Sequence, residues 1–152
     1  MRTAYRILAD VIAVGVAVQA MVMLWAVAGL FHWIDGGGTL DKHVMDAWEK
    51  KLPSFQGAIG FELHGIIGMM VIPLVALALV VVAFLARVPG GVRWSLIVLG
   101  LVVVQVLVGL GAEDAPWLGL VHGLNAFALF STAIVAARSA RPTEQTAVAA
   151  TP

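Results

Sequence analysis

The segment AIGFELHGIIGMMVIPLVALALVVVAFLA, residues 58–86, decides the fold of this chain. A helix that crosses the hydrocarbon core of a bilayer needs about 20 mostly apolar residues. This segment exceeds that length and carries a single acidic side chain, Glu62. Three further segments meet the same requirement, at residues 5–31, 92–111 and 117–137. The sequence therefore predicts an all-α integral membrane protein with an antiparallel four-helix bundle, built by residues 1–138 as one transmembrane domain.

The composition supports a membrane protein and excludes several other classes. Of the 152 residues, 61% are hydrophobic and 12% are charged, whereas soluble domains have about 45–50% apolar and about 25% charged residues. The formal net charge is zero, so overall charge indicates no nucleic-acid partner. The chain has no cysteine, which excludes disulfides, cysteine-ligated iron–sulfur clusters and covalently attached c-type haem.

The two ends of the chain carry their own signals. Two arginines and an A-x-A site at Ala26–Ala28 make the first apolar segment resemble a secretory signal peptide. The segment is longer than the usual apolar region of about 7–15 residues, so we expect a retained span. Residues 139–152 are small and polar, and we expect a disordered cytoplasmic tail.

The distribution of basic residues predicts the orientation. Six arginines lie on the side of the two termini, and the three lysines lie on the other side, in the first loop. Because basic residues are enriched on the cytoplasmic side of a membrane, we expect both termini in the cytoplasm and the protein in the plasma (inner) membrane.

The first loop, TLDKHVMDAWEKKL (39–52), has apolar residues at a spacing of four. They are Leu40, Val44, Trp48 and Leu52. This spacing suits a short amphipathic helix on the outer membrane surface, and a plain polar connector is the alternative.

A short internal repeat indicates a duplicated helical hairpin. VAVQAMVML (16–24) in the first span is similar to VVVQVLVGL (102–110) in the third. Each is followed by a span with an HG pair near its start. Gln19 and Gln105 then lie at similar depth from the inner face.

Two histidines, His64 and His122, lie in the second and fourth spans. They follow Gln56 by eight residues and Pro116 by six, which at about 1.5 Å per residue places them about 12 and 9 Å below the helix starts. Both helices run from outside to inside, so the two rings should lie nearly level. Small or polar residues share their stripes: Gly57, Gly60 and Gly68 beside His64, and Gly119 and Asn125 beside His122.

This pair predicts one haem b held between two axial imidazoles, with His64 and His122 as the iron ligands. Imidazole is a normal axial ligand of haem iron, and bundles build cofactor sites from facing helices. We expect Gly60, Gly68, Gly119, Asn125 and Gln105 to line the same site. A zinc site would need three or four ligands, and Glu62 points away from His64. Two alternatives remain open: a proton relay, or helix packing through hydrogen bonds to Gln19, Gln105 or Asn125, with the glycines serving close helix contact.

The segment VVVQVLVGLGAEDAPWLGLVHGLNAFALF (102–130) resembles half of a haem A synthase. That resemblance implies histidines on the second and fourth helices, matched by His64 and His122, and a Q-x-x-x-G pattern, matched by Gln105 to Gly109. The chain departs from the synthase at Gly65, where that family has arginine, so only the ligand roles carry over. The chain is also similar to a group of small uncharacterised bacterial four-helix membrane proteins with HG and HGLNA motifs.

Two function classes follow from the sequence. The first is a small cytochrome b-like protein that acts as a redox subunit or a haem carrier, with quinone or a redox protein as its partner. The second is a haem-free structural or accessory membrane protein whose buried histidines and glutamines lock helix packing. No catalytic motif is present, so enzymatic activity and oligomeric state stay open. The lipid bilayer is the partner that both classes share.

Overall fold

In the computed structural model, the described residues, 1–48, 50–51 and 53–140, form helices and connections without strands. The elements are α1 (Arg2–Asp35), α2 (Lys42–Trp48), α3 (Ile59–Ile66), the π-helical η1 (Ile67–Val71), α4 (Ile72–Ala86), α5 (Gly91–Gly111) and α6 (Leu118–Ser139). Four helical stretches are long and apolar enough to cross a membrane: α1, α3 through α4, α5 and α6. The predicted all-helical fold with four long apolar helices is confirmed.

Two helices extend further than hydropathy alone predicts. α1 spans Arg2–Asp35, compared with the predicted 5–31. It continues through a polar end because intrahelical bonds persist until Gly36, and Gly37 then takes a φ of 97°, which favours glycine. α6 continues to Ser139, the first residue of the predicted tail. Residues 141–152 of that tail lie outside the described residues.

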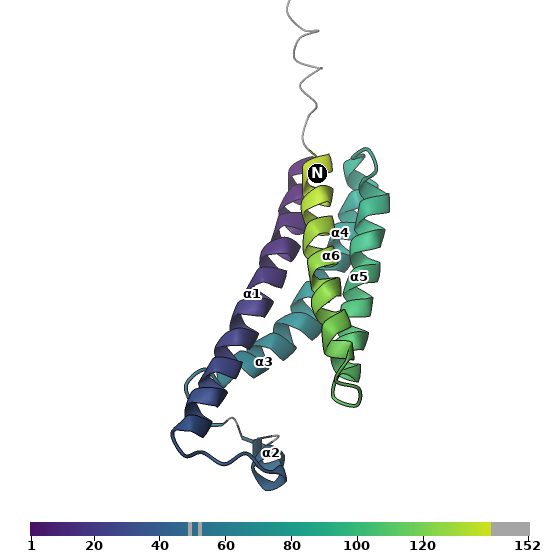
Figure 1. The fold of residues 1–152 in the computed structure, drawn as a ribbon. Helices are drawn as coiled ribbons and strands as arrows, with labels where there is room; N and C mark the ends of the chain where they lie inside the picture. The colour runs from purple at the N-terminus through teal and green to yellow at the C-terminus, as the bar shows by residue number, and fades with distance from the viewer. Residues whose placement is uncertain (49, 52, 141–152) are drawn as a thin grey trace, which may run out of the picture.

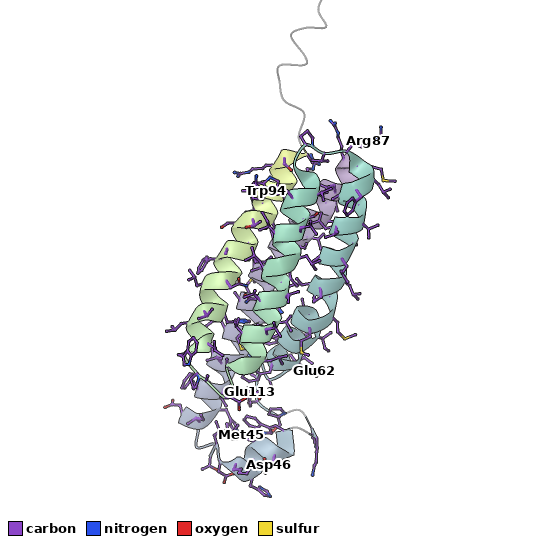
Figure 2. All side chains as sticks on the ribbon, turned by 90° about the vertical axis from the view of Figure 1, so that its right-hand side faces the viewer. Met45, Asp46, Glu62, Arg87, Trp94 and Glu113 are labelled. Atoms are coloured by element: carbon purple, nitrogen blue, oxygen red, sulfur yellow. The ribbon has the colours of Figure 1, made fainter. Side chains whose placement is uncertain are left out.

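The four long helices pack in a ring. α1 contacts α4 and α6, and α5 also contacts α4 and α6, so α4 and α6 face each other diagonally (Figure 1). The start of α1, the α4–α5 turn and the end of α6 lie at one end of the bundle. Figure 2 labels Arg87 and Trp94 at this end and Met45 and Asp46 at the opposite end. We call these the terminal end and the loop end.

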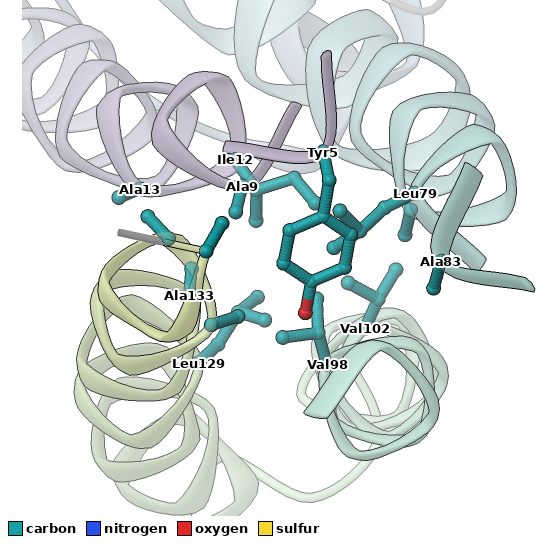
Figure 3. Packing of buried hydrophobic residues seen from close by; sticks show 14 of the residues in the cluster. Tyr5, Ala9, Ile12, Ala13, Leu79, Ala83, Val98, Val102, Leu129 and Ala133 are labelled. Atoms are coloured by element: carbon teal, nitrogen blue, oxygen red, sulfur yellow. The ribbon is translucent and has the colours of Figure 1, made fainter. Parts of the chain in front are cut away.

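The hydrophobic core fills the half of the bundle near the terminal end. Tyr5, Ile12, Leu79, Val98 and Leu129 are among its fully buried side chains (Figure 3). The Tyr5 hydroxyl donates a hydrogen bond to the Gly91 carbonyl at 3.1 Å, which ties α1 to the start of α5. The core ends at the level of Ile72, Val102 and Leu129, where each helix contributes its last member toward the loop end.

The second span changes direction at η1, just before Pro73. Proline has no N–H, so the Met69 carbonyl loses its ordinary helical partner. The chain widens here into a π turn, in which the Ile72 N–H donates to the Ile67 carbonyl. A change of helix direction at this position is the usual effect of a proline within a helix. Beyond the π turn, α3 runs along α1 and diverges from α5 and α6 (Figure 1).

The first loop contains the short helix predicted from its spacing of four. α2 covers Lys42–Trp48. Trp48 packs against Trp33 and Phe55, with ring centres 5.8 and 5.6 Å apart. Val44 is half-buried and Leu40 is exposed, and Leu52 lies outside the described residues. The apolar side of α2 is therefore held by aromatic rings from α1 and from the connection into α3.

Candidate functional site

His64 on α3 and His122 on α6 lie close together across the diagonal of the bundle. Their ring centres are 6.1 Å apart, and the ring planes are inclined by 50°. Both side chains are half-buried. Residues that are distant in the sequence therefore meet in one layer, on the loop-end side of the hydrophobic core.

Each histidine is anchored by the same kind of hydrogen bond. Nδ1 of His64 lies 3.2 Å from the Gln19 carbonyl oxygen, and Nδ1 of His122 lies 3.1 Å from the Gln105 carbonyl oxygen. A carbonyl oxygen only accepts, so Nδ1 donates in both rings. The neutral rings then carry their free lone pair on Nε2. This is the tautomer that a metal-ligating histidine takes when its other nitrogen donates to a backbone carbonyl.

The two anchors occupy equivalent places in the internal repeat. Gln19 and Gln105 are the glutamines of the two similar nonapeptides, and the main-chain carbonyl of each accepts a hydrogen bond from the histidine of the following span. The repeat in the sequence is thus matched by a repeated contact in the structure. In each case a helix carbonyl accepts a hydrogen bond from an imidazole, once between α1 and α3 and once between α5 and α6.

Gly109 lets the His122 ring reach the α5 backbone. A Cβ atom at this position would lie 3.0 and 3.1 Å from Cε1 and Nδ1 of His122. The glycine of the Q-x-x-x-G pattern, one turn after Gln105, therefore makes room for the bond to the Gln105 carbonyl. Gly109 was missing from the predicted site residues, although the motif contained it.

Two polar side chains join the helices around the histidines. The Gln19 amide donates to the His64 carbonyl at 2.9 Å. The Asn125 amide donates to the Leu101 carbonyl at 2.9 Å and to Gln105 Oε1 at 2.6 Å. Gln19 and Asn125 are each only 9% exposed. The expected hydrogen bonds between helices are present, and Gln19, which was predicted to take part in helix packing, bonds directly to His64.

One atom of this layer has no partner within the described part of the chain. Gln19 Oε1 is buried and accepts no hydrogen bond there. A buried acceptor without a donor costs about 1–3 kcal/mol. The layer therefore holds an acceptor that a bound group with a donor could satisfy.

The glycines expected beside the histidines have different surroundings. Gly60 is buried against the Val22 carbonyl and Ala26 of α1, and Gly68 faces the Gln19 amide. These two serve close packing on α1, the alternative that the sequence left open. Gly119 is exposed, and a Cβ atom there would meet nothing within 4 Å. Of the predicted site residues, His64, His122, Gln105 and Asn125 form one connected layer.

The layer is polar where the rest of the bundle is apolar. Toward the loop end of the four spans, the buried described residues are Gln19, Ala26, Gly57, Ala58, Gly60 and Asn125. None of them is a large hydrophobic side chain, in contrast to the close-packed core at the terminal end. The histidines therefore lie where the apolar core stops.

The donor set around the histidines contains two protein ligands. Within the described residues, no three His, Asp, Glu or Cys side chains are grouped to hold a metal ion. Glu62 is exposed and hydrogen-bonds neither ring. A zinc ion would need a third or fourth protein ligand, which these described residues do not supply.

Comparison with known proteins places part of the chain in a described group. Residues 52–111 match a family of unknown function (DUF6220). The DUF6220 stretch includes His64, Gln105 and Gly109 and ends before His122. The prediction of an uncharacterised family is confirmed for this stretch. No curated protein and no solved structure matches the chain, so the resemblance to haem A synthase gains no support.

A substitution at Gly109 tests how the second histidine is held. Gly109→Leu should displace the His122 ring from the Gln105 carbonyl, because the new side chain would occupy the place of the ring. Gly100→Leu is the matched control on the same helix, since a Cβ atom there meets nothing within 4 Å. The imidazole nitrogen NMR shifts of labelled His122 should change in the first variant only. Equal shifts in both variants would show that Gly109 does not make this space.

Proposed function

We propose that the protein binds one haem b between His64 and His122 and acts as a redox subunit of a membrane electron-transfer system. The separation of the two rings carries the proposal. Two imidazoles on opposite sides of one metal ion, each with a bond of about 2 Å, place their ring centres about 6 Å apart. The ring centres of His64 and His122 are 6.1 Å apart.

The hydrogen bonds of the two rings support axial ligation. Donation from Nδ1 to a helix carbonyl fixes the tautomer, orients the ring and raises the basicity of Nε2. Gln19 supplies the carbonyl for His64, and Gln105 supplies it for His122. Both carbonyls belong to long helices, so the rings are held by rigid backbone.

The donor set also suits haem. A porphyrin brings four nitrogen ligands of its own, so two protein ligands complete a six-coordinate iron. The lack of large buried apolar side chains at this level distinguishes the layer from the close-packed core. When bound, haem supplies reversible one-electron chemistry. With both axial positions taken by histidine, electron transfer is favoured over binding of a small molecule to the iron.

The depth of the site constrains the partner. The hydrocarbon core is about 30 Å thick, and one haem at the loop-end half does not cross it. We therefore propose that electrons are exchanged with quinone or a redox protein on the loop side. A haem carrier with the same two ligands would give up the group to a partner, whereas a redox subunit retains it through repeated reduction and oxidation.

An absorbance spectrum of the detergent-purified full chain, expressed with added haem precursor, tests the proposal. We expect a reduced-minus-oxidised difference spectrum of the b type, with one haem per chain. Haem that is lost to apo-myoglobin within the time of the measurement would indicate a carrier. A blank spectrum from folded protein would overturn haem binding.

A haem-free packing role is the second candidate, and one observation favours it. Gln19, Gln105 and Asn125 already join α1 to α3 and α5 to α6 through hydrogen bonds. In that case His64 and His122 would be two further members of this polar packing. The blank spectrum is the result that this candidate predicts.

We further propose that the protein lies in the plasma (inner) membrane with both termini in the cytoplasm, on the basis of the six-to-three distribution of basic residues. Because the chain has no cysteine, single substitutions give a clean test. Thr39→Cys, in the loop before α2, should react with a membrane-impermeant thiol reagent added to intact cells. Pro89→Cys, in the α4–α5 turn, should react only after lysis. The reverse pattern would invert the topology.

A further inference from the structure

A small groove lies at the loop end of α1, where the connection into α3 packs on this helix. The groove has a volume of about 230 Å³. Its lining residues are Trp25, Ala28, Gly29 and His32 of α1 and Gln56 of the connection. Sites that enclose a drug-sized ligand measure roughly 300–1,000 Å³. The groove therefore suits a single ring whose remaining part stays outside.

The groove is built by close contacts between two parts of the main chain. A Cβ atom at Gly29 would overlap the Gln56 carbonyl, and one at Gly57 would lie 2.7 Å from the Trp25 carbonyl oxygen. Gly57 also has a φ of 91°, which favours glycine. The connection is therefore seated on α1 at two glycines, and this contact fixes the separation of the groove walls.

The groups in the groove both donate and accept hydrogen bonds. His32 and Gln56 are exposed, and neither side chain forms a hydrogen bond within the described residues. A neutral imidazole has one donor and one acceptor nitrogen, and a side-chain amide has atoms of both kinds. Trp25 adds an N–H donor and a flat aromatic face. Among the described residues, no Lys, Arg, Asp or Glu lines the groove.

This set of groups discriminates between ligands found at a membrane surface. A lipid phosphate is an anion that only accepts hydrogen bonds, and its strong partners are Lys and Arg. A quinone accepts hydrogen bonds at its two carbonyl oxygens, whereas the quinol donates them from two hydroxyl groups. Groups that both donate and accept hold either form. The groove therefore matches the ring of a quinone better than the headgroup of a phospholipid.

The groove lies on the loop side of the histidine layer. Trp25 and His32 follow Gln19, whose carbonyl accepts a hydrogen bond from His64, by six and thirteen residues. At about 1.5 Å per residue, they lie about 9 and 20 Å further along α1. Leu24, next to Trp25, is an exposed apolar side chain. A ring with an apolar tail can therefore reach the groove from the bilayer.

We propose that this groove binds the ring of a quinone, with His32 and Gln56 hydrogen-bonded to the ring oxygens and Trp25 against the ring face. The tail then extends into lipid. The choice of a redox-active ring rests on the proposed function, which places electron exchange on the loop side of the membrane.

Photolabelling of the haem-free full chain in lipid nanodiscs tests the groove. The probe is an azido derivative of ubiquinone with a short alkyl tail, and mass spectrometry maps its attachment. We expect label between Trp25 and His32 or at Gln56, and excess decylubiquinone should displace it. Decanol, which has the tail and lacks the ring, should not. Label spread evenly over the exposed helices would overturn the proposal, and displacement by decanol would overturn it in favour of a lipid groove.

Variants identify the groups that hold the ring. His32→Leu and Gln56→Leu should each lower labelling at limiting probe by up to about tenfold, the loss expected for one hydrogen bond. His32→Gln keeps a donor and an acceptor and should retain most of the labelling. Ala28→Trp should block labelling by filling the groove. His43→Leu changes an exposed histidine of the first loop, outside the groove, and is the matched control. Unchanged labelling in both leucine variants of the groove would refute the assignment.

The labelling does not depend on haem, so the two proposals fail separately. Failed labelling together with a b-type haem spectrum would refute the groove and leave the histidine site. Specific labelling together with a blank haem spectrum would refute the histidine site and leave the groove as a quinone-binding site.

Discussion

His64→Ala and His122→Ala should each abolish the low-spin bis-imidazole haem spectrum while the protein stays in the membrane. Each substitution removes one of the two proposed ligands, and within the described residues no group of three His, Asp, Glu or Cys side chains offers a replacement. Replacement by alanine leaves the four spans intact, so insertion should not change. The measurement is the reduced-minus-oxidised spectrum of each purified variant, together with its haem-to-protein ratio.

Gln105→Leu is the matched control for His122→Ala. Gln105 holds the His122 ring through its main-chain carbonyl, which leucine retains, and only its side-chain bond to Asn125 is lost. Polar contacts between membrane helices average about 0.6 kcal/mol. The control should therefore unfold at a slightly lower temperature than the parent protein and keep its haem spectrum. An unchanged spectrum in both histidine variants would refute their assignment as ligands. Loss of haem in Gln105→Leu as well would show that haem binding depends on the Gln105 side chain and not on its main-chain carbonyl.

Gly60→Ala should destabilise the fold, and more than Gly65→Ala on the same helix. The added Cβ atom would overlap the main-chain carbonyl of Val22 and lie 3.0 Å from the Ala26 Cβ. A helix backbone cannot move aside as a flexible side chain can, so α3 must shift away from α1. Overpacking of this kind costs about 1–3 kcal/mol. Thermal unfolding in detergent, followed by circular dichroism, measures the loss.

Gly65→Ala provides the comparison on the same helix. A Cβ atom there meets nothing within 4 Å, and alanine is favoured over glycine inside a helix by about 1 kcal/mol. Gly65→Ala should therefore melt at the same temperature as the parent protein or slightly above it. If the two variants melt alike, the contact between Gly60 and α1 does not support the fold.

Hydropathy was sufficient to predict the four spans, because the membrane requires a length of apolar helix that few other features imitate. Hydropathy was insufficient to predict where the helices end. The last turn of α1 is polar and helical, since its end is set by Gly36 and Gly37. The level of the two histidines also followed from counting residues, because the rise of a helix is constant.

The partners of the glycines could not be predicted from spacing alone. Gly60 and Gly68 share a stripe with His64 in the sequence, and all three face α1, where the His64 ring bonds to the Gln19 carbonyl. Spacing shows that these residues share a face of one helix, but it does not show which neighbouring helix that face contacts. The role of Gly109 was missed for a different reason. The sequence shows that a glycine follows Gln105 by one turn, but only the structure shows which ring fills the space.

The π turn at η1 divides the second span into two parts that pack against different neighbours. α4 packs in the apolar core. In contrast, α3 packs on α1 and diverges from α5 and α6 (Figure 1). The position of His64 is therefore set by the contact of α3 with α1, separately from the apolar core.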